Sequence, residues 1–182
     1  MSLLDEKARL DLAVRLLRRR ARISIAHQET GLSRNKLRAL YRELHGRPAP
    51  SGQLPAIGCA TIQTRCQQVH ASLFARIYER LGGDGIYESL DIQAVLAAQD
   101  LYRQLISEPP EIDFNGAWVV ARDLRVGKSV LKFCGCCQVR YLVSENSRAP
   151  TSCPICALYA RKESSAPSPT TRKGPVKLPH SG

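Results

Sequence analysis

The chain has 182 residues, of which 43% are hydrophobic and only 5% are aromatic, so a core of mainly aliphatic side chains is expected. It contains no apolar run of roughly 18 residues and no basic N-terminal region followed by an apolar run, so we expect neither a membrane-spanning helix nor a secretory signal. The net charge of +11 favours a polyanionic partner.

The positive charge is concentrated at the two ends of the chain. Residues 1–47 have a net charge of +7, residues 48–125 of −3, and residues 126–182 of +7. Two basic ends suit nucleic acid, whereas no amphipathic segment with large aromatic side chains supports binding to an acidic membrane surface. Seven cysteines without an export signal favour the reducing cytoplasm, where clustered thiols bind metal.

The first predicted element is a helix over residues 3–21. Ser2 is a suitable N-cap, acidic residues follow in the first turn, and apolar residues recur on one face. The arginines toward its C-terminal end are Arg15, Arg18, Arg19, Arg20 and Arg22. We interpret them either as a solvated helix end, where the dipole favours cations, or as phosphate contacts.

Residues 23–45 have the pattern of a helix-turn-helix motif. A short helix is followed by Gly31, which is expected in the left-handed region, and by Ser33, which can cap a second helix running to about Leu44. Apolar positions at spacings of three and four would hold the two helices at a fixed angle. The predicted inward positions are Ala26, Thr30, Leu32, Leu37 and Leu40.

In such a motif the start of the second helix enters the major groove of DNA. Arginine suits guanine, asparagine suits adenine, and lysine suits guanine or phosphate. The predicted DNA-contacting residues are Ser33, Arg34, Asn35, Lys36, Arg38 and Arg42. A plain helical hairpin is the alternative, because helix–glycine–helix patterns occur in many helical proteins.

The middle of the chain is predicted to be an extended connector followed by helices. Prolines over residues 46–60 prevent a helix there. The helices that follow are expected over residues 61–82, 88–107 and 114–127. The inward positions expected in the second of them are Leu90, Ala94, Ala97, Leu101 and Leu105.

Three further features of this region have predicted structural roles. Asp113 is expected to cap the helix from residue 114, and Trp118 to anchor the core. Cys66 and His70 share a helix face, but we interpret them as structural because an isolated pair lacks further ligands.

Five cysteines mark the C-terminal region. Cys134 and Cys137 form one Cys-x-x-Cys pair, and Cys153 and Cys156 form another after fifteen intervening residues, which is the spacing of a four-cysteine zinc site. Thiolates of two facing turns can reach one metal at about 2.3 Å and complete a tetrahedron. We therefore predict one structural Zn²⁺ on these four residues, with Cys136 free. Two disulfides or a thiol redox centre are the alternatives.

Short strands at residues 130–133 and 140–143 are expected around the first pair, in a zinc-ribbon-like layout. The sequence thus predicts a mainly α protein, with a helical domain that contains a helix-turn-helix and a small four-cysteine zinc-ribbon-like module after it. The predicted regions are 1–47 with the helix-turn-helix, 48–128 as a central helical region, 129–162 as the zinc module and 163–182 as a disordered basic tail.

Several motifs occur in one order along the chain. They are Gly31-Leu32-Ser33-Arg34, Leu40-Tyr41-Arg42-Glu43-Leu44, Gly46 with Pro48 and Pro50, Leu54-Pro55, Val69-His70-Ala71-Ser72, Ala117-Trp118, and Cys134-Gly135-Cys136-Cys137 with Cys153-x-x-Cys156. Over about residues 10–156 this combination resembles the FlhC family of bacterial flagellar transcriptional activators. The resemblance implies a DNA-binding activator of flagellar operons that works with FlhD in a hetero-oligomer, promotes transcription by RNA polymerase and holds zinc through the four cysteines.

Two functions from other classes compete with this one. The first is a protein-interaction adaptor, stabilised by zinc, whose partner makes most of the sequence-specific DNA contacts. The second is an enzyme with a cysteine nucleophile. We do not expect an enzyme, because the cysteines fit one saturated metal site and no His–acid arrangement can be named.

Overall fold

The computed structural model describes residues 2–51, 62–106, 111–145 and 147–164. In these ranges the chain is mainly helical with one two-stranded sheet, which confirms the predicted fold class. None of the described helices is long and apolar enough to cross a membrane. The elements are α1 (Leu3–Arg18), α2 (Ile23–Thr30), α3 (Arg34–His45), α4 (Arg65–Gly82), the 3-10 helix η2 (Gly83–Tyr87), α5 (Ile92–Leu105), α6 (Phe114–Arg125), β1 (Ser129–Phe133), β2 (Arg140–Ser144) and α7 (Pro154–Ser164).

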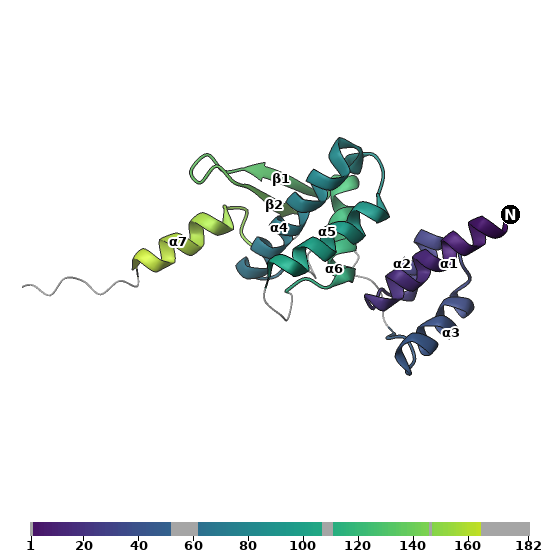
Figure 1. Ribbon diagram of the computed structural model, residues 1–182. Helices are drawn as coiled ribbons and strands as arrows, with labels where there is room; N and C mark the ends of the chain where they lie inside the picture. The colour runs from purple at the N-terminus through teal and green to yellow at the C-terminus, as the bar shows by residue number, and fades with distance from the viewer. Residues whose placement is uncertain (1, 52–61, 107–110, 146, 165–182) are drawn as a thin grey trace, which may run out of the picture.

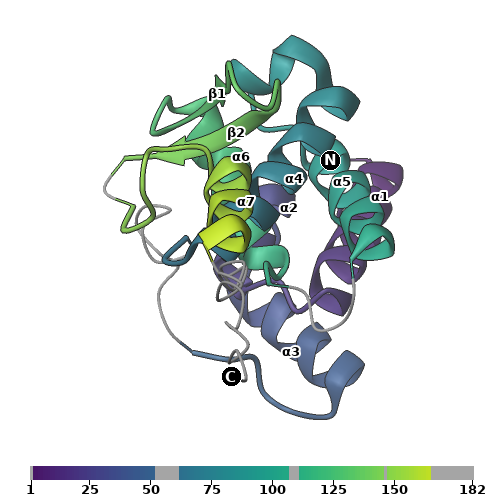
Figure 2. The same ribbon diagram turned by 90° about the vertical axis from the view of Figure 1, so that its left-hand side faces the viewer.

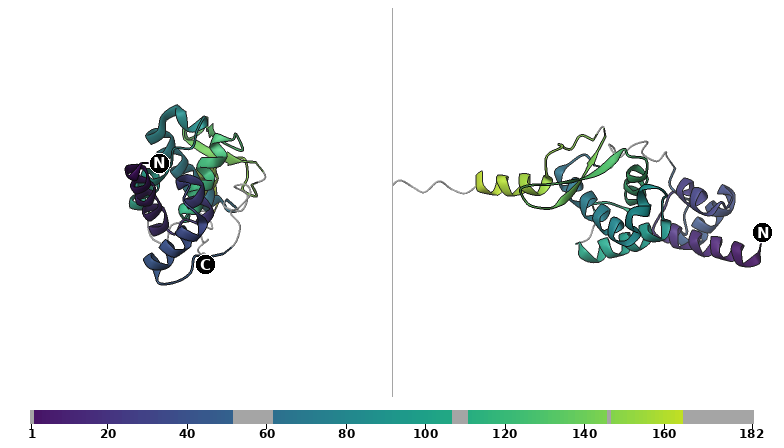
Figure 3. Two further views of the ribbon diagram at one scale, coloured as in Figure 1. Left: turned by 90° about the vertical axis from the view of Figure 1, so that its right-hand side faces the viewer. Right: turned by 90° about the horizontal axis from the view of Figure 1, so that it is seen from above.

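The elements form three parts arranged in a row, as Figure 1 and the right-hand view of Figure 3 show. Helices α1–α3 make one end, α4–α6 the middle, and the hairpin β1–β2 with α7 the other end. Seen from the α7 end in Figure 2, the hairpin lies to one side of α7, and both pack against α4. The helix-turn-helix region and the cysteine region are therefore at opposite ends of the molecule.

The first helix begins as predicted and ends earlier than predicted. A capping box joins Ser2 and Asp5 at its start. It ends at Arg18, because Arg20 takes a left-handed φ of 59° and its N–H bonds to the carbonyl of Leu17 at 2.8 Å. The chain can then turn directly into α2, instead of continuing to residue 21.

The core is centred on α4, which packs against α5, α6 and β2. Trp118 is 2% exposed, which confirms its predicted place in the core. Asp113 caps α6, as predicted, because its Oδ1 accepts the Gly116 N–H at 2.8 Å. The other large side chains with almost no exposed surface include Tyr41, Tyr78, Tyr102 and Phe74.

The predicted inward face of α5 is wrong for three of its five residues. Ala97, Leu101 and Leu105 are exposed, whereas Ala94 is buried and Leu90 is partly buried. The face that α5 buries also includes a glutamine and a tyrosine, Gln99 and Tyr102. Both make hydrogen bonds inside the protein: Gln99 Nε2 donates to the Ile112 carbonyl, and the Tyr102 hydroxyl bonds to His70.

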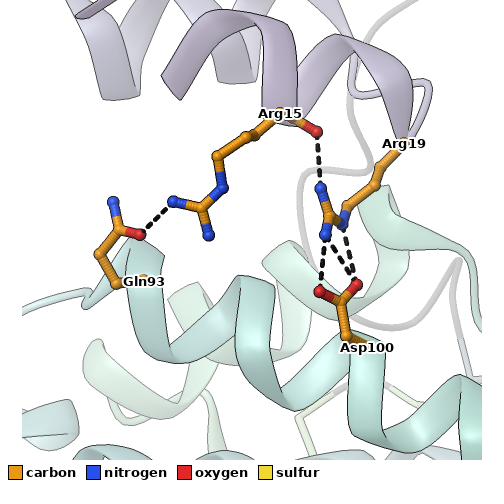
Figure 4. A network of polar contacts seen from close by, with 4 residues as sticks. All are labelled: Arg15, Arg19, Gln93 and Asp100. Atoms are coloured by element: carbon orange, nitrogen blue, oxygen red, sulfur yellow. Dashed lines mark hydrogen bonds and ion pairs between the residues drawn. The ribbon is translucent and has the colours of Figure 1, made fainter. Parts of the chain in front are cut away.

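Polar side chains dock the N-terminal helices onto the middle of the molecule. The Arg19 guanidinium binds both carboxylate oxygens of Asp100 at 2.8 and 2.6 Å, and Arg15 Nη1 donates to Gln93 Oε1 at 2.7 Å, as Figure 4 shows. Arg19 also donates to the carbonyl of Arg15, so one arginine joins α1 to itself and to α5. These contacts fix α1 against α5.

A second link between the two parts involves a half-buried carboxylate. Trp118 Nε1 donates to Glu29 Oε1 at 2.9 Å. Burial raises the pKa of Glu29, against the opposing effects of the Trp118 hydrogen bond and of Arg125. When the pKa of a carboxyl group is higher in the folded than in the unfolded state, its contribution to stability is fully present below the unfolded pKa. This contribution is lost as pH rises through the folded pKa.

We therefore expect Glu29→Gln to raise the melting temperature at pH 7. Glutamine keeps an acceptor for Trp118 and is neutral at every pH, so its advantage should shrink as pH falls through the glutamate range. Thermal unfolding at pH 7 and near pH 4 measures the difference, with the exposed Glu88→Gln as the matched control. An advantage of equal size at both pH values would contradict a charge-burial origin.

Two predicted irregular segments fall largely outside the described residues. Of the connector predicted over 46–60, the structure describes residues 46–51, which contain no helix or strand. Of the tail predicted over 163–182, Glu163 and Ser164 belong to the end of α7, and residues 165–182 are outside the described ranges.

Candidate functional site

The hairpin and the start of α7 bring the two cysteine pairs together. Strands β1 and β2 pair antiparallel, from Ser129 opposite Ser144 to Phe133 opposite Arg140, and the turn between them carries the first pair. This turn is tight: the Cys134 N–H donates to the Val139 carbonyl and the Gln138 N–H to the Cys134 carbonyl, both at 2.9 Å.

The second cysteine pair lies at the start of a helix. Cys153 directly precedes α7, and Cys156 lies in its first turn. Pro154 occupies the first helical position, where its fixed φ suits a helix and its missing N–H is not needed. The helix N-terminus also favours thiolates.

The four sulfur atoms have the spacing of metal ligands. All four Sγ atoms lie within 4.8 Å of one another, and the Cys134–Cys156 and Cys137–Cys153 Sγ pairs are each 3.6 Å apart. A regular tetrahedron with metal–sulfur bonds of about 2.3 Å has sulfur–sulfur edges of about 3.8 Å, whereas a disulfide bond is about 2.05 Å long. The geometry therefore fits a metal ion and argues against the two-disulfide alternative.

The pKa values of the clustered thiols are also compatible with a bound cation. The backbone N–H groups of Cys137 and Cys136 hold the pKa of the Cys134 thiol at about 6. The pKa of the Cys156 thiol is raised, because hydrogen bonds with the side chains of Cys137 and then Cys134 favour its neutral form. A bound divalent cation would favour the thiolate form instead, and four thiolates would fill its coordination sphere.

The remaining cysteines stay apart from this cluster. Cys136 is exposed and is not among the four clustered residues, as predicted. Cys66 is exposed, and His70 Nδ1 lies 2.9 Å from the Tyr102 hydroxyl, which gives it a structural partner. Cys59 lies outside the described residues. Among the described residues, no second group of three or more potential ligands is found.

The turn between α2 and α3 has the predicted conformation. Gly31 ends α2 with φ of 69°, and the Ser33 hydroxyl caps α3 by accepting the Lys36 N–H at 3.3 Å. The sequence did not reveal the role of His27, whose Nδ1 lies 2.7 Å from the Leu32 carbonyl and holds the turn from inside. The predicted inward residues Ala26, Thr30, Leu32 and Leu37 are buried, and Leu40 is partly buried.

The predicted DNA-contacting residues of α3 fall into two groups. Ser33 and Lys36 are used within the protein, because Ser33 caps the helix and Lys36 Nζ pairs with Glu6 at 2.9 Å. The other four are exposed, namely Arg34, Asn35, Arg38 and Arg42. Arg38 donates to the Asn35 side chain at 3.3 Å, and the side chains of Arg34 and Arg42 have no hydrogen bond or ion pair with any described residue.

A hollow of about 660 Å³ runs beside these arginines. It is lined by Arg34, Arg38 and Arg42 of α3, by Arg22 before α2, and by residues 48–51. Arg22 Nη1 donates to the Ser51 carbonyl at 3.3 Å, which links the proline-containing segment to the residue before α2. In the sequence, Arg22 and the prolines are separate features. That they line one hollow could not be predicted from it, because the Arg22–Ser51 contact joins residues 29 positions apart.

Comparison with known proteins gives a consistent set of similarities. Residues 1–167 match the family model described as flagellar transcriptional activator (FlhC). The chain is 32% identical to the flagellar transcriptional regulator FlhC of Serratia marcescens over 161 residues, which covers 86% of this chain and 80% of the relative. It is 30% identical to the FlhC of Yersinia enterocolitica over 161 residues, with 86% and 81% covered, and 36% identical to that of Cupriavidus metallidurans over 139 residues, with 75% and 64% covered.

Proposed function

The chain belongs to the FlhC family of flagellar transcriptional activators, which is not a class of enzymes, and from this premise we propose that it reads promoter DNA through α3. It does so in the cytoplasm, in a hetero-oligomer with FlhD, and thereby promotes transcription of flagellar operons by RNA polymerase. The observation that supports this proposal most directly is the exposed cationic face of α3, beside a hollow lined by four arginines.

The exposed side chains at the start of α3 suit contacts to base edges. Arg34 can donate two parallel hydrogen bonds to guanine, and Asn35 can bind adenine through its amide. Both side chains are exposed, and they follow a capped helix end with fixed direction. We assign base contacts to Arg34, Asn35 and Arg38 and phosphate contacts to Arg42. Ser33 and Lys36 hold the helix in place, because their polar groups already have partners in the protein.

A structural Zn²⁺ belongs to the same proposal. Cys134, Cys137, Cys153 and Cys156 would hold it, and when bound it would neutralise the thiolates and join the hairpin to α7. The cluster lies at the opposite end of the molecule from α3, so the metal would stabilise the fold without taking part in base contacts.

The adaptor function is a second candidate because the molecule carries exposed apolar side chains away from α3. Leu101 and Leu105 of α5 are 39% and 61% exposed, and Phe133 of the hairpin is 59% exposed. Exposed apolar groups, where they gather, are typical of protein–protein contacts. In this function the partner would read the DNA, and α3 would serve as scaffold.

Substitution at the start of α3 separates the two functions. We expect Arg34→Ala to lower the preference for promoter over scrambled DNA about tenfold, which is the usual effect of losing one bidentate base contact. Fluorescence anisotropy of the co-expressed complex with FlhD measures both affinities, and gel filtration measures assembly. Arg80→Ala, at an exposed arginine near the end of α4, is the matched control.

The base-reading proposal fails if Arg34→Ala and Asn35→Ala complexes assemble normally and discriminate between the two duplexes as the unsubstituted complex does. In that case the partner or the hairpin region reads the sequence. Loss of assembly without a direct defect in DNA binding would favour the adaptor function.

A further inference from the structure

The hollow beside α3 continues into two more hollows, toward the junction of the N-terminal helices with α5 and α6. The next hollow, of about 360 Å³, shares Arg22, Pro48 and Pro50 with the first. The third, of about 470 Å³, shares Arg20 and Asp113 with the second. Because neighbouring hollows share lining residues, the three form a row from α3 toward the end of α5, which we call the arginine groove.

The charge of this groove is almost entirely positive beyond α3. Arg18, Arg20 and Arg47 line its second and third hollows, and their side chains make no hydrogen bond or ion pair with any described residue. Among the described lining residues Asp113 is the only acid, and its carboxylate is bound to the Gly116 N–H and to the Asn115 amide. The groove therefore holds several guanidinium groups that face a single carboxylate, that of Asp113.

Arg20 has a backbone conformation that favours glycine. Its φ of 59° lies in the left-handed region, which L-residues with a side chain adopt at a cost in free energy. Its carbonyl accepts a hydrogen bond from Asn115, and its N–H donates to Leu17, and glycine could make both bonds equally well. The arginine side chain is thus not needed for the turn, and it lines two of the three hollows. Residues kept in such conformations are concentrated at functional sites.

We propose that the arginine groove binds the sugar–phosphate backbone of the DNA beyond the segment that α3 reads. A row of guanidiniums along three adjoining hollows matches the repeated phosphates of a polymer, whereas a small anion would occupy one hollow only. These contacts would carry affinity and register but no sequence information. That the polymer is DNA rests on the proposed function. The arginine groove would be a second DNA-binding surface, which a helix-turn-helix alone does not provide.

The test replaces the three free arginines in one variant, Arg18→Ser/Arg20→Gly/Arg47→Ser. The control variant, Arg80→Ser/Lys132→Ser/Arg148→Ser, removes three cations outside the groove. Full-length chain co-expressed with FlhD is titrated by fluorescence anisotropy with a flagellar promoter duplex and a scrambled duplex over a salt series. We expect the groove variant to lose affinity for both duplexes by similar factors, with a log–log salt slope that is flatter by about 0.9 for each lost contact.

The single variant Arg20→Gly separates a binding role from a structural role. Glycine relieves the strained φ, so the melting temperature should not fall, while DNA affinity should fall. A melting temperature that falls with unchanged affinity would overturn the proposal, and so would a salt slope equal to that of the unsubstituted complex. Equal losses in the groove and control variants would overturn it in favour of diffuse attraction.

The result for the groove variant can be distinguished from the result for the α3 substitutions. Loss of promoter preference in the groove variant, at an unchanged salt slope, would overturn the phosphate assignment. If Arg34→Ala and Asn35→Ala leave the preference intact while the groove variant flattens the salt slope, then base reading by α3 fails and the groove proposal stands.

Discussion

Cys153→Ser is expected to release the metal and unfold the hairpin end of the molecule. Zinc content should fall from one per chain to well below one, because three thiolates and a hydroxyl make a much weaker site. Structural zinc in small zinc peptides contributes about 10–16 kcal/mol of apparent binding free energy, which is comparable to or more than the total stability of most domains. The turn of the two-stranded hairpin carries two of the four proposed ligands, so this turn should open after such a loss.

The loss should be confined to one end of the chain. The core around α4, α5 and α6 has its own buried aromatic side chains, so its helices should remain. Zinc content by plasma mass spectrometry, together with hydrogen exchange at the Cys134 and Gln138 amides, measures the two effects separately. In the intact protein both amides donate to carbonyls of the turn, and in the variant they should exchange quickly.

Cys136→Ser is the matched control for this substitution. Its thiol is exposed and lies outside the cluster, so the variant should keep one zinc per chain and its protected amides. Equal zinc loss in the two variants would contradict the assignment of the ligands. Retention of zinc in both would mean that Cys153 is not a ligand.

Local signals in the sequence predicted much of this structure. The turn at Gly31, the cap at Ser33 and the cap at Asp113 each depend on residues within four positions, and all three occur as expected. The cysteine spacing likewise predicted which four sulfurs lie together, because two-residue gaps restrict each pair to a single tight turn. Such features depend only on residues close together in the chain, so the sequence alone can predict them.

The errors arise where a distant residue changes the local preference. Gln99 marks a polar face of α5 in the sequence, but it is buried because the Ile112 carbonyl, thirteen residues away, accepts its amide. The predicted inward face of α5 therefore included Leu101 and Leu105, which are exposed in the structure. The ion pair of Lys36 on α3 had no local signal either, because its partner Glu6 lies thirty residues earlier in the chain. Periodicity along a helix holds no information about such partners.

The same kind of distant contact joins the cysteine end to the helical core, through Gln68 of α4. Its Nε2 donates to the carbonyls of Leu142 and Pro150, both at 3.1 Å, and the side chain is almost fully buried. One turn later, the Ser72 hydroxyl accepts the Leu142 N–H at 2.9 Å. Helix α4 thus supplies the hydrogen bonds that a third strand would otherwise supply to β2.

Gln68→Leu should therefore destabilise the protein by about 1–3 kcal/mol. Leucine is similar in size, but it leaves the buried Leu142 carbonyl without this donor, and an unsatisfied buried group costs about 1–3 kcal/mol, whereas water can reach the carbonyl of the exposed Pro150. For a chain of this length the melting temperature should fall by about 2–12 °C. Gln104→Leu, at an exposed glutamine of α5, is the matched control and should change stability by less than about 0.5 kcal/mol.

Zinc content distinguishes this effect from damage to the metal site. The Gln68→Leu variant should keep one zinc per chain, because the hydrogen bonds lie on β2 and on Pro150 and none of the four ligands is touched. Faster exchange of the Leu142 amide at full zinc occupancy would then show that the hairpin has loosened from α4 as a unit. A melting temperature equal to that of Gln104→Leu would instead mean that water satisfies both carbonyls, and that the junction depends on apolar packing around Leu142 alone.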